Sequence, residues 1–560
     1  MGDSGTKKKV LVVAGLGSVL LVVAVIAGAI LLSKKSGTIS HGGGSVSATS
    51  KAVQFVCSPT DYKETCQKSL AGATTTDPKK LIEAAFDATV RNIGDVLKSS
   101  ATLKQAATDP STKGAFDVCD EVLQNAVDEL KTSIDKVDIF DASKGKDFVA
   151  DLRTLLAGVG DDQETCIDAF ENTTGDTGEK MKSLLKTAKE MSSNGLAMVS
   201  DISSLLGALQ LGKVSSGGSA GGRKLLSEEE IAWVDRRILQ DAKSSLKPTM
   251  VVAKDGSGQF NTIAEALSTL PKKNNETAIV IYIKAGVYAE TVVFPKKVNK
   301  VVVMGDGPEK TIITGKKSFA GGVKTYHTAT VAVNADDFVA KDIAFENTAG
   351  SDGHQAVALR VSGDRAVFSN VRIDGYQDTL YAHKYRQYYS GCTISGTIDF
   401  IFGDALALFQ DCTFVVRKPG PNQACMVTAE GRIDPRSPGA FVIQNSHITG
   451  EPALLTAKPA VKVYLGRPWK ELSRTIIMQS NIDGIIDPTG WAPWVGTFAI
   501  DTCYYGEYEN RGPGSKTEGR VTWKGIKKIT PQIAQSWTGR AAFGNDTWIT
   551  ASGVPYVPTI

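Results

Sequence analysis

Two aspartates in the second half of the chain are spaced so that they would lie next to each other if the chain forms stacked coils of about 21 residues. Asp399 follows Asp378 by 21 residues, and Gln377 follows Gln355 by 22. If each coil has that length, these side chains lie above one another on one face. Two crowded carboxyls seldom ionise together, so one can keep its proton as a general acid while the other attacks as an anion. Taken singly, each aspartate is more typical of a turn.

The surroundings of Asp399 call for a positive charge. The segment Ile398-Asp399-Phe400-Ile401-Phe402 is otherwise apolar, and a carboxylate in such a setting needs a cation. Arg467, in Leu465-Gly466-Arg467-Pro468-Trp469, is the candidate. No metal or cofactor is expected, because the histidines show no ligand spacing. They are residues 41, 327, 354, 383 and 447.

A repeated pattern after residue 250 supports a coiled chain. Short strands rich in Val, Ile, Phe and Thr alternate with turns, and a turn-type residue stands three positions before an apolar one. The copies are 342–345, 370–373, 391–394, 411–414, 445–448 and, more weakly, 479–482. Irregular periods of this size predict a β-solenoid whose loops vary in length. A β-sandwich would give short strands without the same pattern returning in register.

Two cysteines occupy the same position in consecutive copies of this pattern. They are Cys392 and Cys412. Stacked coils lie about 4.8 Å apart, and a disulfide needs Cα atoms roughly 4.4–6.8 Å apart. We therefore expect a bridge between them, with two buried thiols as the alternative.

The first half of the chain has helical spacing from about residue 52 to residue 210. Apolar stripes run over 81–97, 116–130, 152–159, 181–188 and 196–209. Several amphipathic helices with short connections predict a helical bundle. Cys57 and Cys66 are close enough to close a short hairpin, while Cys119 and Cys166 fall on separate helical segments that they could join. Nothing here indicates catalysis, so a folding or binding module is the better interpretation.

The N-terminus carries a membrane signal. Three lysines precede an uncharged apolar run over residues 10–32, which would span about 34 Å as a helix. Because a cleaved signal peptide has a shorter apolar region, we expect a signal-anchor with a cytoplasmic N-terminus; cleavage after the run is the alternative. Either way the bulk of the chain enters the secretory pathway, where disulfides form. Three glycosylation sequons fit this compartment, at Asn172, Asn275 and Asn545.

A linker separates the two halves. Residues 211–222 are rich in Gly and Ser, and two basic clusters follow, Arg223-Lys224 and Arg236-Arg237. Exposed linkers are preferred sites of proteolysis, so we expect processing here. The predicted organisation is therefore a tail, anchor and spacer over 1–50, a helical pro-region over 51–210, a linker over 211–244 and a β-helix over 245–560.

The charge is divided between the halves. Residues 51–222 carry 19 basic and 26 acidic side chains, a net −7, whereas residues 240–560 carry 35 and 29, a net +6. A basic unit suits a polyanion. Its basic residues are scattered and match no nucleic-acid-binding module, so an acidic polysaccharide is favoured and nucleic acid is not expected as a partner.

Five ordered segments resemble the plant-type pectin methylesterases, or pectinesterases, over about residues 245–560. They are 286–290, 353–359, 375–380, 396–403 and 465–469. The first half resembles the pectin methylesterase inhibitor domain, including its four-cysteine pattern. The whole layout is similar to a group I precursor. The resemblance implies an all-β right-handed parallel β-helix, preceded by an all-α bundle and a transmembrane segment.

The resemblance also implies roles for three residues in ester hydrolysis. Asp399 would attack the methyl-ester carbonyl and form an acyl-enzyme anhydride. Asp378 would protonate the departing methanol and then, as a base, activate water. Gln377 would donate hydrogen bonds to the oxyanion.

Four further residues match positions of the family that contact substrate or support the pair. Gln355 would support the substrate and the intermediate, and Arg467 would hold Asp399 ionised. Trp469 would offer an aromatic face to a galacturonate ring, and Thr325 matches another substrate-contacting position. The implied substrate is methyl-esterified pectin.

The resemblance further implies partners and a location. A subtilisin-like protease would cut at one of the basic clusters, and the pro-region or separate inhibitor proteins would bind the enzyme. The precursor would be membrane-anchored and the mature enzyme would act in the cell wall. Two alternatives stay open: a pectin-binding wall protein without activity, and a β-helix lyase or glycoside hydrolase. A calcium-dependent lyase would need a clustered carboxylate site.

Overall fold

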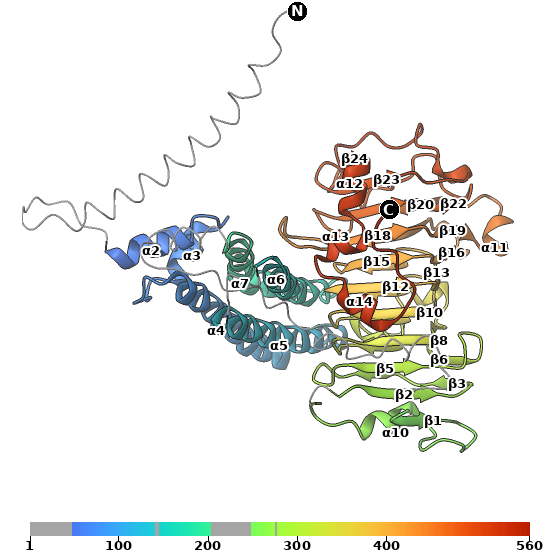
Figure 1. Ribbon diagram of the computed structural model, residues 1–560, viewed down its shortest axis with the longest axis horizontal. Coiled ribbons are helices and arrows are strands. Elements are labelled where there is room, and N and C mark those ends of the chain that lie inside the picture. The colour runs from blue at the N-terminus through green and yellow to red at the C-terminus, as the bar shows by residue number, and fades with distance from the viewer. Residues whose placement is uncertain (1–46, 140–144, 203–247, 275–276) are drawn as a thin grey trace, which may run out of the picture.

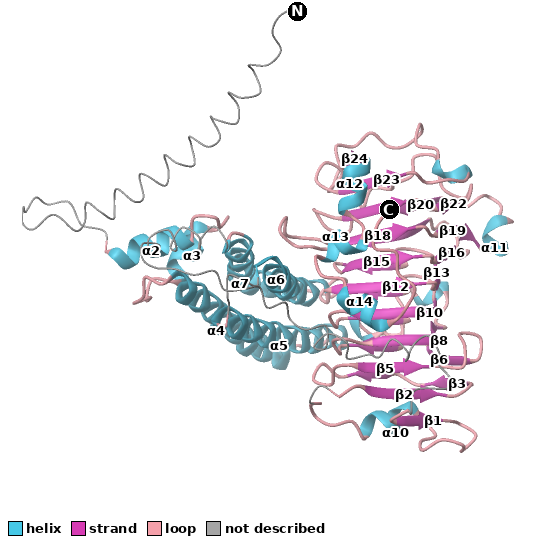
Figure 2. Ribbon diagram, viewed as in Figure 1, coloured by secondary structure: helices cyan, strands magenta, loops and turns pink. Residues whose placement is uncertain are grey.

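The structure is a computed structural model that describes residues 47–139, 145–202, 248–274 and 277–560. These form a helical unit (47–202) and a β unit (248–560), which Figures 1 and 2 show side by side. The expected anchor over 10–32, both basic clusters and Asn275 lie outside the described residues. Among the described helices, none is long and apolar enough to cross a membrane.

The helical unit is a bundle of four long helices with two short ones at its start. The helices are α2 (Ala48–Val56), α3 (Lys63–Ser69), α4 (Pro78–Ala106), α5 (Pro110–Asp138), α6 (Gly145–Asp168) and α7 (Thr177–Ser200). Asp77 and Asp109 cap α4 and α5 by accepting a backbone hydrogen bond, and a proline follows each cap. Disulfides Cys57–Cys66 and Cys119–Cys166 link α2 to α3 and α5 to α6, as expected.

The stripes at 181–188 and 196–209 do not form separate helices. The first belongs to α7 and the second begins in it as far as Ser200; Ile202 follows the C-cap residue Asp201, and positions beyond 202 lie outside the described residues. A Cβ at Gly195 would lie 3.0 Å from the Phe86 ring, so the backbone of α7 approaches α4 closely at this point.

The β unit is a coil of short parallel strands. Its first strands are β1 (Met250–Val252), β2 (Ile279–Ile283), β3 (Gly286–Ala289), β4 (Val292–Phe294), β5 (Val301–Met304), β6 (Thr311–Gly315), β7 (Val331–Val333) and β8 (Val339–Asn347). Next come β9 (Leu359–Val361), β10 (Ala366–Asp374), β11 (Leu380–Ala382), β12 (Arg386–Ser390), β13 (Thr393–Gly396), β14 (Ile401–Gly403), β15 (Leu406–Gln410) and β16 (Thr413–Val416). The last are β17 (Cys425–Glu430), β18 (Ala440–Gln444), β19 (His447–Gly450), β20 (Val463–Gly466), β21 (Arg474–Met478), β22 (Asn481–Ile482), β23 (Tyr504–Tyr508) and β24 (Ile526–Lys528).

The strands stack into three ladders, two of which join into one large sheet through the long strands β8 and β10, and this stacking confirms the predicted parallel β-helix. In the described residues one face is the sheet β20-β17-β14-β11-β9-β7-β4, and the other strands form a larger sheet. Short helices lie around the coil: α10 (Ile263–Ser268), α11 (Pro452–Leu455), α12 (Pro531–Ser536), α13 (Gly539–Phe543), α14 (Thr547–Ser552), and the 3-10 turns η3 (Thr325–His327), η4 (Ser351–Gly353) and η5 (Pro513–Ser515). Residues of α12, α13 and α14 cover the outer side of the large sheet (Figure 2), so strands there are buried on both sides.

The repeated sequence pattern corresponds to one backbone feature in every copy. The turn-type residue has a left-handed φ between 49° and 60° in all six: Asp342, Asn370, Gly391, Asp411, Asn445 and Gln479. Gly, Asn and Asp adopt this conformation most readily, which explains the composition of the pattern. The apolar residue three positions later stacks in register through the core as Phe345, Ile373, Ile394, Phe414, Ile448 and Ile482.

The expected bridge between Cys392 and Cys412 is wrong in this structure. The residues that follow them, Thr393 and Thr413, are register partners on adjacent coils, but both cysteines are free buried thiols. Their Sγ atoms lie 3.5 Å and 3.3 Å from the carbonyl oxygens of Phe368 and Gln410. Side chains at equivalent positions of parallel strands leave the backbone in the same direction, whereas a disulfide needs Cβ atoms only about 3.8 Å apart and turned toward each other.

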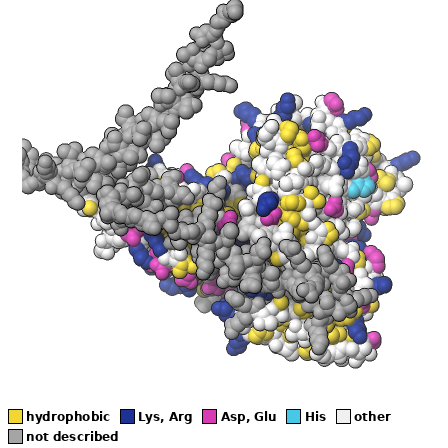
Figure 3. Space-filling view, viewed as in Figure 1, with side chains coloured by type: hydrophobic (Ala, Val, Ile, Leu, Met, Phe, Trp, Pro, Cys, Tyr) yellow, Lys and Arg dark blue, Asp and Glu magenta, His cyan; other side chains and the backbone are white. Residues whose placement is uncertain are grey.

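The helical unit packs on the seven-stranded face of the coil. One hydrophobic cluster contains the helical core together with Tyr326, Ala332, Val357, Tyr381 and Phe402 of the β unit. In Figure 1 the bundle extends sideways from this coil. Charges of both signs are spread over the visible surface of the β unit (Figure 3), in line with the scattered basic residues of the sequence.

Candidate active site

The two aspartates occupy equivalent positions on neighbouring coils. Asp378 stands two residues before β11 and Asp399 two residues before β14, and the first residues of these strands, Leu380 and Ile401, are register partners. Both aspartates have a left-handed φ, 61° and 50°. This conformation is uncommon for a residue with a side chain and is often found at functional sites. The expectation that the pair lies on one face is confirmed.

Arg467 pairs with one aspartate and not with the other. It follows β20 and donates from Nε and Nη2 to the two carboxylate oxygens of Asp399, over 2.8 Å and 2.5 Å. Its guanidinium also lies over the ring of Trp494, 4.2 Å from the centroid. Two parallel hydrogen bonds and an aromatic face fix the orientation of this arginine, and thereby that of Asp399.

The two carboxyls consequently differ in pKa. Burial raises the pKa of Asp378 well above its usual value, and the charge of Asp399 raises it further. Burial also raises the pKa of Asp399, but the charge and hydrogen bonds of Arg467 oppose that rise. The proton of the pair therefore belongs on Asp378 and the negative charge on Asp399.

Every residue proposed from the sequence for catalysis or substrate contact lines one cavity of about 230 Å³. These residues are Thr325, Gln355, Gln377, Asp378, Asp399, Arg467 and Trp469. Within the described residues, no hydrogen bond engages the side-chain amide of either glutamine. A backbone hydrogen bond joins the two segments that carry these glutamines: Ala356 N donates to Gln377 O over 3.2 Å. Both amides are thus available to a ligand.

Aromatic residues that the sequence did not single out complete the wall. They are Phe319, Tyr326, Tyr381, Phe402 and Trp494. The rings of Tyr381 and Phe402 stack with centroids 4.2 Å apart, and Trp469 packs edge-on against Phe402 at 5.8 Å. Apolar faces of this kind suit a sugar ring. Phe402 belongs to segment 396–403, one of the five that resemble the family, whereas Trp494 lies in no repeat and in none of these segments.

The helical unit contributes to the same cavity. Thr165, Asp168, Ala169 and Glu171, at the end of α6 and just after it, line it together with the aspartates. Thr165 Oγ1 lies 2.9 Å from His383 Nε2, and Lys324 Nζ donates to Glu171 O over 3.5 Å. The cavity is therefore closed partly by residues from the other half of the chain, which the sequence could not indicate.

A buried ion cluster holds the two units together next to the cavity. Lys384 follows β11, and its Nζ lies 2.8 Å from Glu129 of α5 and 2.7 Å from Asp162 of α6. Lys296 pairs with the same Glu129 at 2.8 Å. Burial alone would lower the pKa of Lys384, but Asp162 and Glu129 raise it, so the lysine stays charged.

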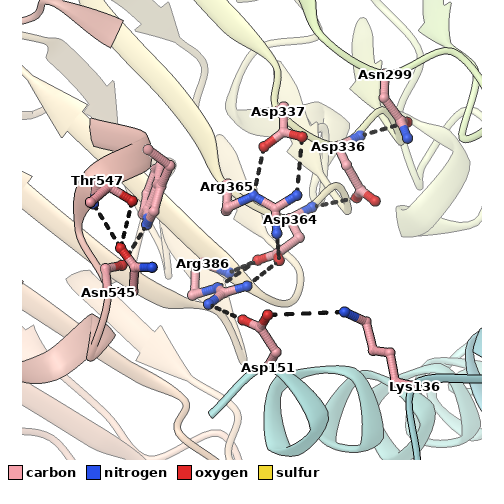
Figure 4. A network of polar contacts seen from close by, with 11 residues as sticks. Lys136, Asp151, Asn299, Asp336, Asp337, Asp364, Arg365, Arg386, Asn545 and Thr547 are labelled. Carbon is pink, nitrogen blue, oxygen red and sulfur yellow. Dashed lines mark hydrogen bonds and ion pairs between the residues drawn. The ribbon is translucent and has the colours of Figure 1, made fainter. Parts of the chain in front are cut away.

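A second polar network continues along the interface (Figure 4). Asp151 of α6 accepts from Arg386 over 2.7 Å, and Lys136 of α5 stands 4.0 Å from it. Arg386 also donates to Asp364. Despite burial, Arg386 and Arg365 hold the pKa of Asp364 at about 2. Arg386 of the β unit and Asp151 of the helical unit thus each have a further partner of opposite charge within their own unit.

Two of the expected glycosylation sites are described. Asn172 is exposed, in the loop after α6. Asn545 is half-buried, and its Oδ1 accepts from the backbone N and the hydroxyl of Thr547 over 3.0 Å and 2.6 Å (Figure 4). Glycosylation at these residues stays a prediction. In the part of the chain that the structure describes, no group of histidine, cysteine or carboxylate side chains could hold a metal ion.

Together, the parallel β-helix and its buried carboxyl pair are typical of an enzyme that uses carboxyl groups as nucleophile and acid. Residues 249–546 match the family model Pectinesterase, and residues 51–198 match Plant invertase/pectin methylesterase inhibitor. The chain belongs to the pectinesterase family and carries an inhibitor-like domain.

Relatives share this two-part layout. The chain is 49% identical to the probable pectinesterase/pectinesterase inhibitor 58 of Arabidopsis thaliana, over 99% of both chains. It is 46% identical to the putative pectinesterase/pectinesterase inhibitor 28 of the same plant, over 99% of this chain and 75% of the relative. Among solved structures, pectin methylesterase from carrot is 47% identical with a TM-score of 0.56, covering 57% of this chain and 99% of its own.

Proposed function

We propose that the chain hydrolyses the methyl esters of galacturonate residues in pectin, releasing methanol and leaving acidic pectin. The observation that supports this most directly is the carboxyl pair, in which Asp378 holds a proton beside an Asp399 that Arg467 keeps charged. A nucleophile and an acid with these protonation states can cleave an ester without a metal.

In the first half of the reaction, Asp399 is the nucleophile. Its carboxylate oxygen attacks the ester carbonyl carbon and forms a tetrahedral oxyanion. The C–O bond to the methoxy group then breaks, Asp378 transfers its proton to the methoxy oxygen, and methanol leaves. An anhydride between Asp399 and the galacturonate remains, and Asp378 is now a carboxylate.

In the second half, Asp378 acts as a base. It takes a proton from a water molecule whose oxygen attacks the galacturonate carbonyl of the anhydride. The bond to Asp399 breaks and its carboxylate returns to Arg467, while the product acid loses its proton to solvent. Over the cycle one ester and one water give one acid and one methanol.

The other cavity residues stabilise the oxyanion and position the substrate. Gln377 donates to the oxyanion, where one preorganised donor is worth about 10²–10³ in turnover. Gln355 supports the same group from the next coil, and Trp469 and Thr325 contact the sugar. This function is favoured over a pectin-binding protein without activity, because binding alone gives no reason for a protonated carboxyl beside an anionic one.

The helical unit keeps the enzyme inactive until it is removed. Asp168 and Glu171 stand in the cavity that the substrate would occupy, and the buried cluster around Lys384 fastens them there. A membrane-anchored precursor in the secretory pathway, cut by a protease at Arg223-Lys224 or Arg236-Arg237, would release the active β unit into the cell wall.

Methanol release from one methylated pectin tests both parts of this proposal. Residues 240–560 should be active, and uncleaved 51–560 should be far less active at the same concentration. Excess 51–222 should inhibit 240–560, more weakly at 1 M salt, where the Debye length falls to about 3 Å. No methanol from 240–560 would contradict the activity, and equal release by both forms would contradict the inhibition.

A further inference from the structure

Lys470 stands beside the catalytic cavity, and its role in the structure is not catalytic. It follows Trp469 directly, and its Nζ lies 5.0 Å from the centroid of that ring. Only 15% of the side chain is exposed. A lysine so enclosed needs a counter-charge, because an unpaired buried ammonium is costly.

The counter-charges of Lys470 come entirely from the other half of the chain. Its Nζ lies 2.6 Å from Asp168 Oδ1 and 3.1 Å from Glu164 Oε1, both on α6. Among the described residues of the β unit, none pairs a carboxylate with it. Arg467 differs, since its partner Asp399 belongs to its own unit. Removal of the helical unit therefore leaves Lys470 without a carboxylate.

The position of Asp168 shows where a ligand carboxylate would lie. Asp168 lines the cavity that contains Asp378, Asp399 and Trp469, and it also lines a small cavity of about 20 Å³ under Lys470. The helical unit thus holds a carboxylate on a lysine at the edge of the catalytic cavity. Removal of the helical unit would take this carboxylate away from Lys470.

We propose that Lys470 binds the free carboxylate of a galacturonate neighbouring the one whose ester is cleaved, and that Asp168 imitates that carboxylate in the precursor. This inference rests on the proposed function. A methyl ester carries no charge and offers the lysine only a neutral acceptor, whereas a carboxylate restores the stronger ionic hydrogen bond that Asp168 makes. Lys470 therefore gives the enzyme a preference for pectin that is already partly de-esterified.

The test uses the β unit alone. The carrot enzyme matches this chain over 99% of its own length but only 57% of this chain, so a β unit of this kind folds without a helical unit. Lys470→Gln removes the charge and Lys470→Arg keeps it. Lys524→Gln is the control, because Lys524 is 82% exposed and pairs only with Asp501. Thermal melting checks that each variant is folded.

Two oligogalacturonides of equal length are compared, one fully methyl-esterified and one half-esterified, with KM and kcat taken from methanol release. A charge-assisted hydrogen bond supports an effect of about tenfold. We expect Lys470→Gln to raise KM for the half-esterified substrate about tenfold more than for the fully esterified one, with kcat much less affected. Lys470→Arg should restore most of the preference, and Lys524→Gln should behave as the unchanged enzyme.

Binding of an unesterified oligogalacturonide gives a readout that needs no turnover. Calorimetry should show about tenfold weaker binding to Lys470→Gln. Equal changes of KM on both substrates, or equal binding of the unesterified chain, would overturn the role of Lys470. Absence of methanol release by the unchanged β unit from either substrate would instead contradict the proposed activity.

Discussion

The catalytic carboxyl pair and the interface cluster both contain buried charges, but the partners of these charges come from different parts of the chain. Asp399 is paired with Arg467, and both belong to the β unit. Lys384 is paired with Glu129 and Asp162, both from the helical unit. The site has two carboxyls for one arginine, so one carboxyl keeps a proton, whereas the cluster has two lysines for its two carboxylates.

This difference separates chemistry from control. The charges of Asp399 and Arg467, which set the protonation states of the carboxyl pair together with burial, belong to the β unit, and the helical unit adds the smaller effect of Glu171 on the pKa of Asp378. The charges of Lys384 and Lys470 are satisfied only while the units are joined. A substitution in the pair should therefore affect turnover, and a substitution in the cluster should affect docking.

The largest effect is expected at the nucleophile. Asp399→Asn in residues 240–560 should lower turnover by at least about 10⁴-fold, the scale of losing a nucleophilic residue, because a neutral amide cannot attack the ester. Methanol release measures it, and circular dichroism checks the fold. Asp411→Asn is a matched control, since Asp411 has the same left-handed backbone in an exposed turn. Near-normal release from a folded Asp399→Asn protein would refute the assignment.

The next effect should fall on docking alone. Lys384→Met leaves Asp162 buried without its paired lysine and Glu129 with Lys296 alone, and breaking a buried pair costs about 3–5 kcal/mol. Titration calorimetry between 51–222 and 240–560 should show that loss of binding free energy, with turnover of 240–560 nearly unchanged. Arg436→Met is the comparison: its partner Asp61 is 53% exposed, so the loss should stay below about 1 kcal/mol. Equal losses would show that burial of the cluster is unimportant.

A smaller effect is expected for the oxyanion donor. Gln377→Ala should lower kcat about 10²–10³-fold, with KM changed much less, because the hydrogen bond is made chiefly in the transition state. Steady-state kinetics of 240–560 separates the two constants. An effect on KM alone would assign Gln377 to substrate binding.

The smallest effect, when taken over a single pH unit, is a pH dependence of docking. Burial at the interface raises the pKa of Asp161 to about 8, with the side chain of Asp404 and the charge of Lys384 opposing the rise and Asp162 and Glu129 adding to it. A carboxyl with a raised pKa is protonated in the docked state and ionised in the free state between pH 4 and 8. Docking therefore weakens as pH rises through this window, by at most about tenfold per pH unit for this proton.

Calorimetry of the two units at pH 5, 6, 7 and 8 measures the slope of the docking free energy against pH. Asp161→Asn should flatten it, because the amide cannot ionise. Asp120→Asn serves as a control, since Asp120 is exposed on α5. A slope that survives Asp161→Asn would place the proton on another interface carboxyl, such as Asp162, whose pKa burial raises to about 7.

Much of the coil and of its site could be predicted from the sequence. The left-handed turns need Gly, Asn, Asp or a similar residue once per coil, so residues such as Asn370 and Asp411 mark the coils directly. Asp378 and Asp399 could be placed together because a solenoid converts sequence spacing into stacking. Their pattern is local, and local patterns can be read without knowing the rest of the fold.

What could not be predicted depends on contacts between distant segments or on side-chain direction. Trp494 reaches the cavity through an irregular loop, and Asp168 reaches it from the other unit. The thiols of Cys392 and Cys412 show the second limit: spacing places them on adjacent coils but does not fix the direction of their side chains, and both thiols are free. The single helix α7 spans two apolar stripes that their periodicity alone does not join.

If the helical unit inhibits the enzyme as proposed, the buried cluster around Lys384 has a consequence for the timing of activation. While the two units are one chain, they meet at an effective concentration set by the segment that joins them. A cut in that segment breaks no contact of Lys384, Glu129 or Asp162. It converts an intramolecular contact into one between two molecules, which then holds only as far as their dilution allows. Proteolysis would therefore prepare the enzyme, and dilution into a larger volume would start it.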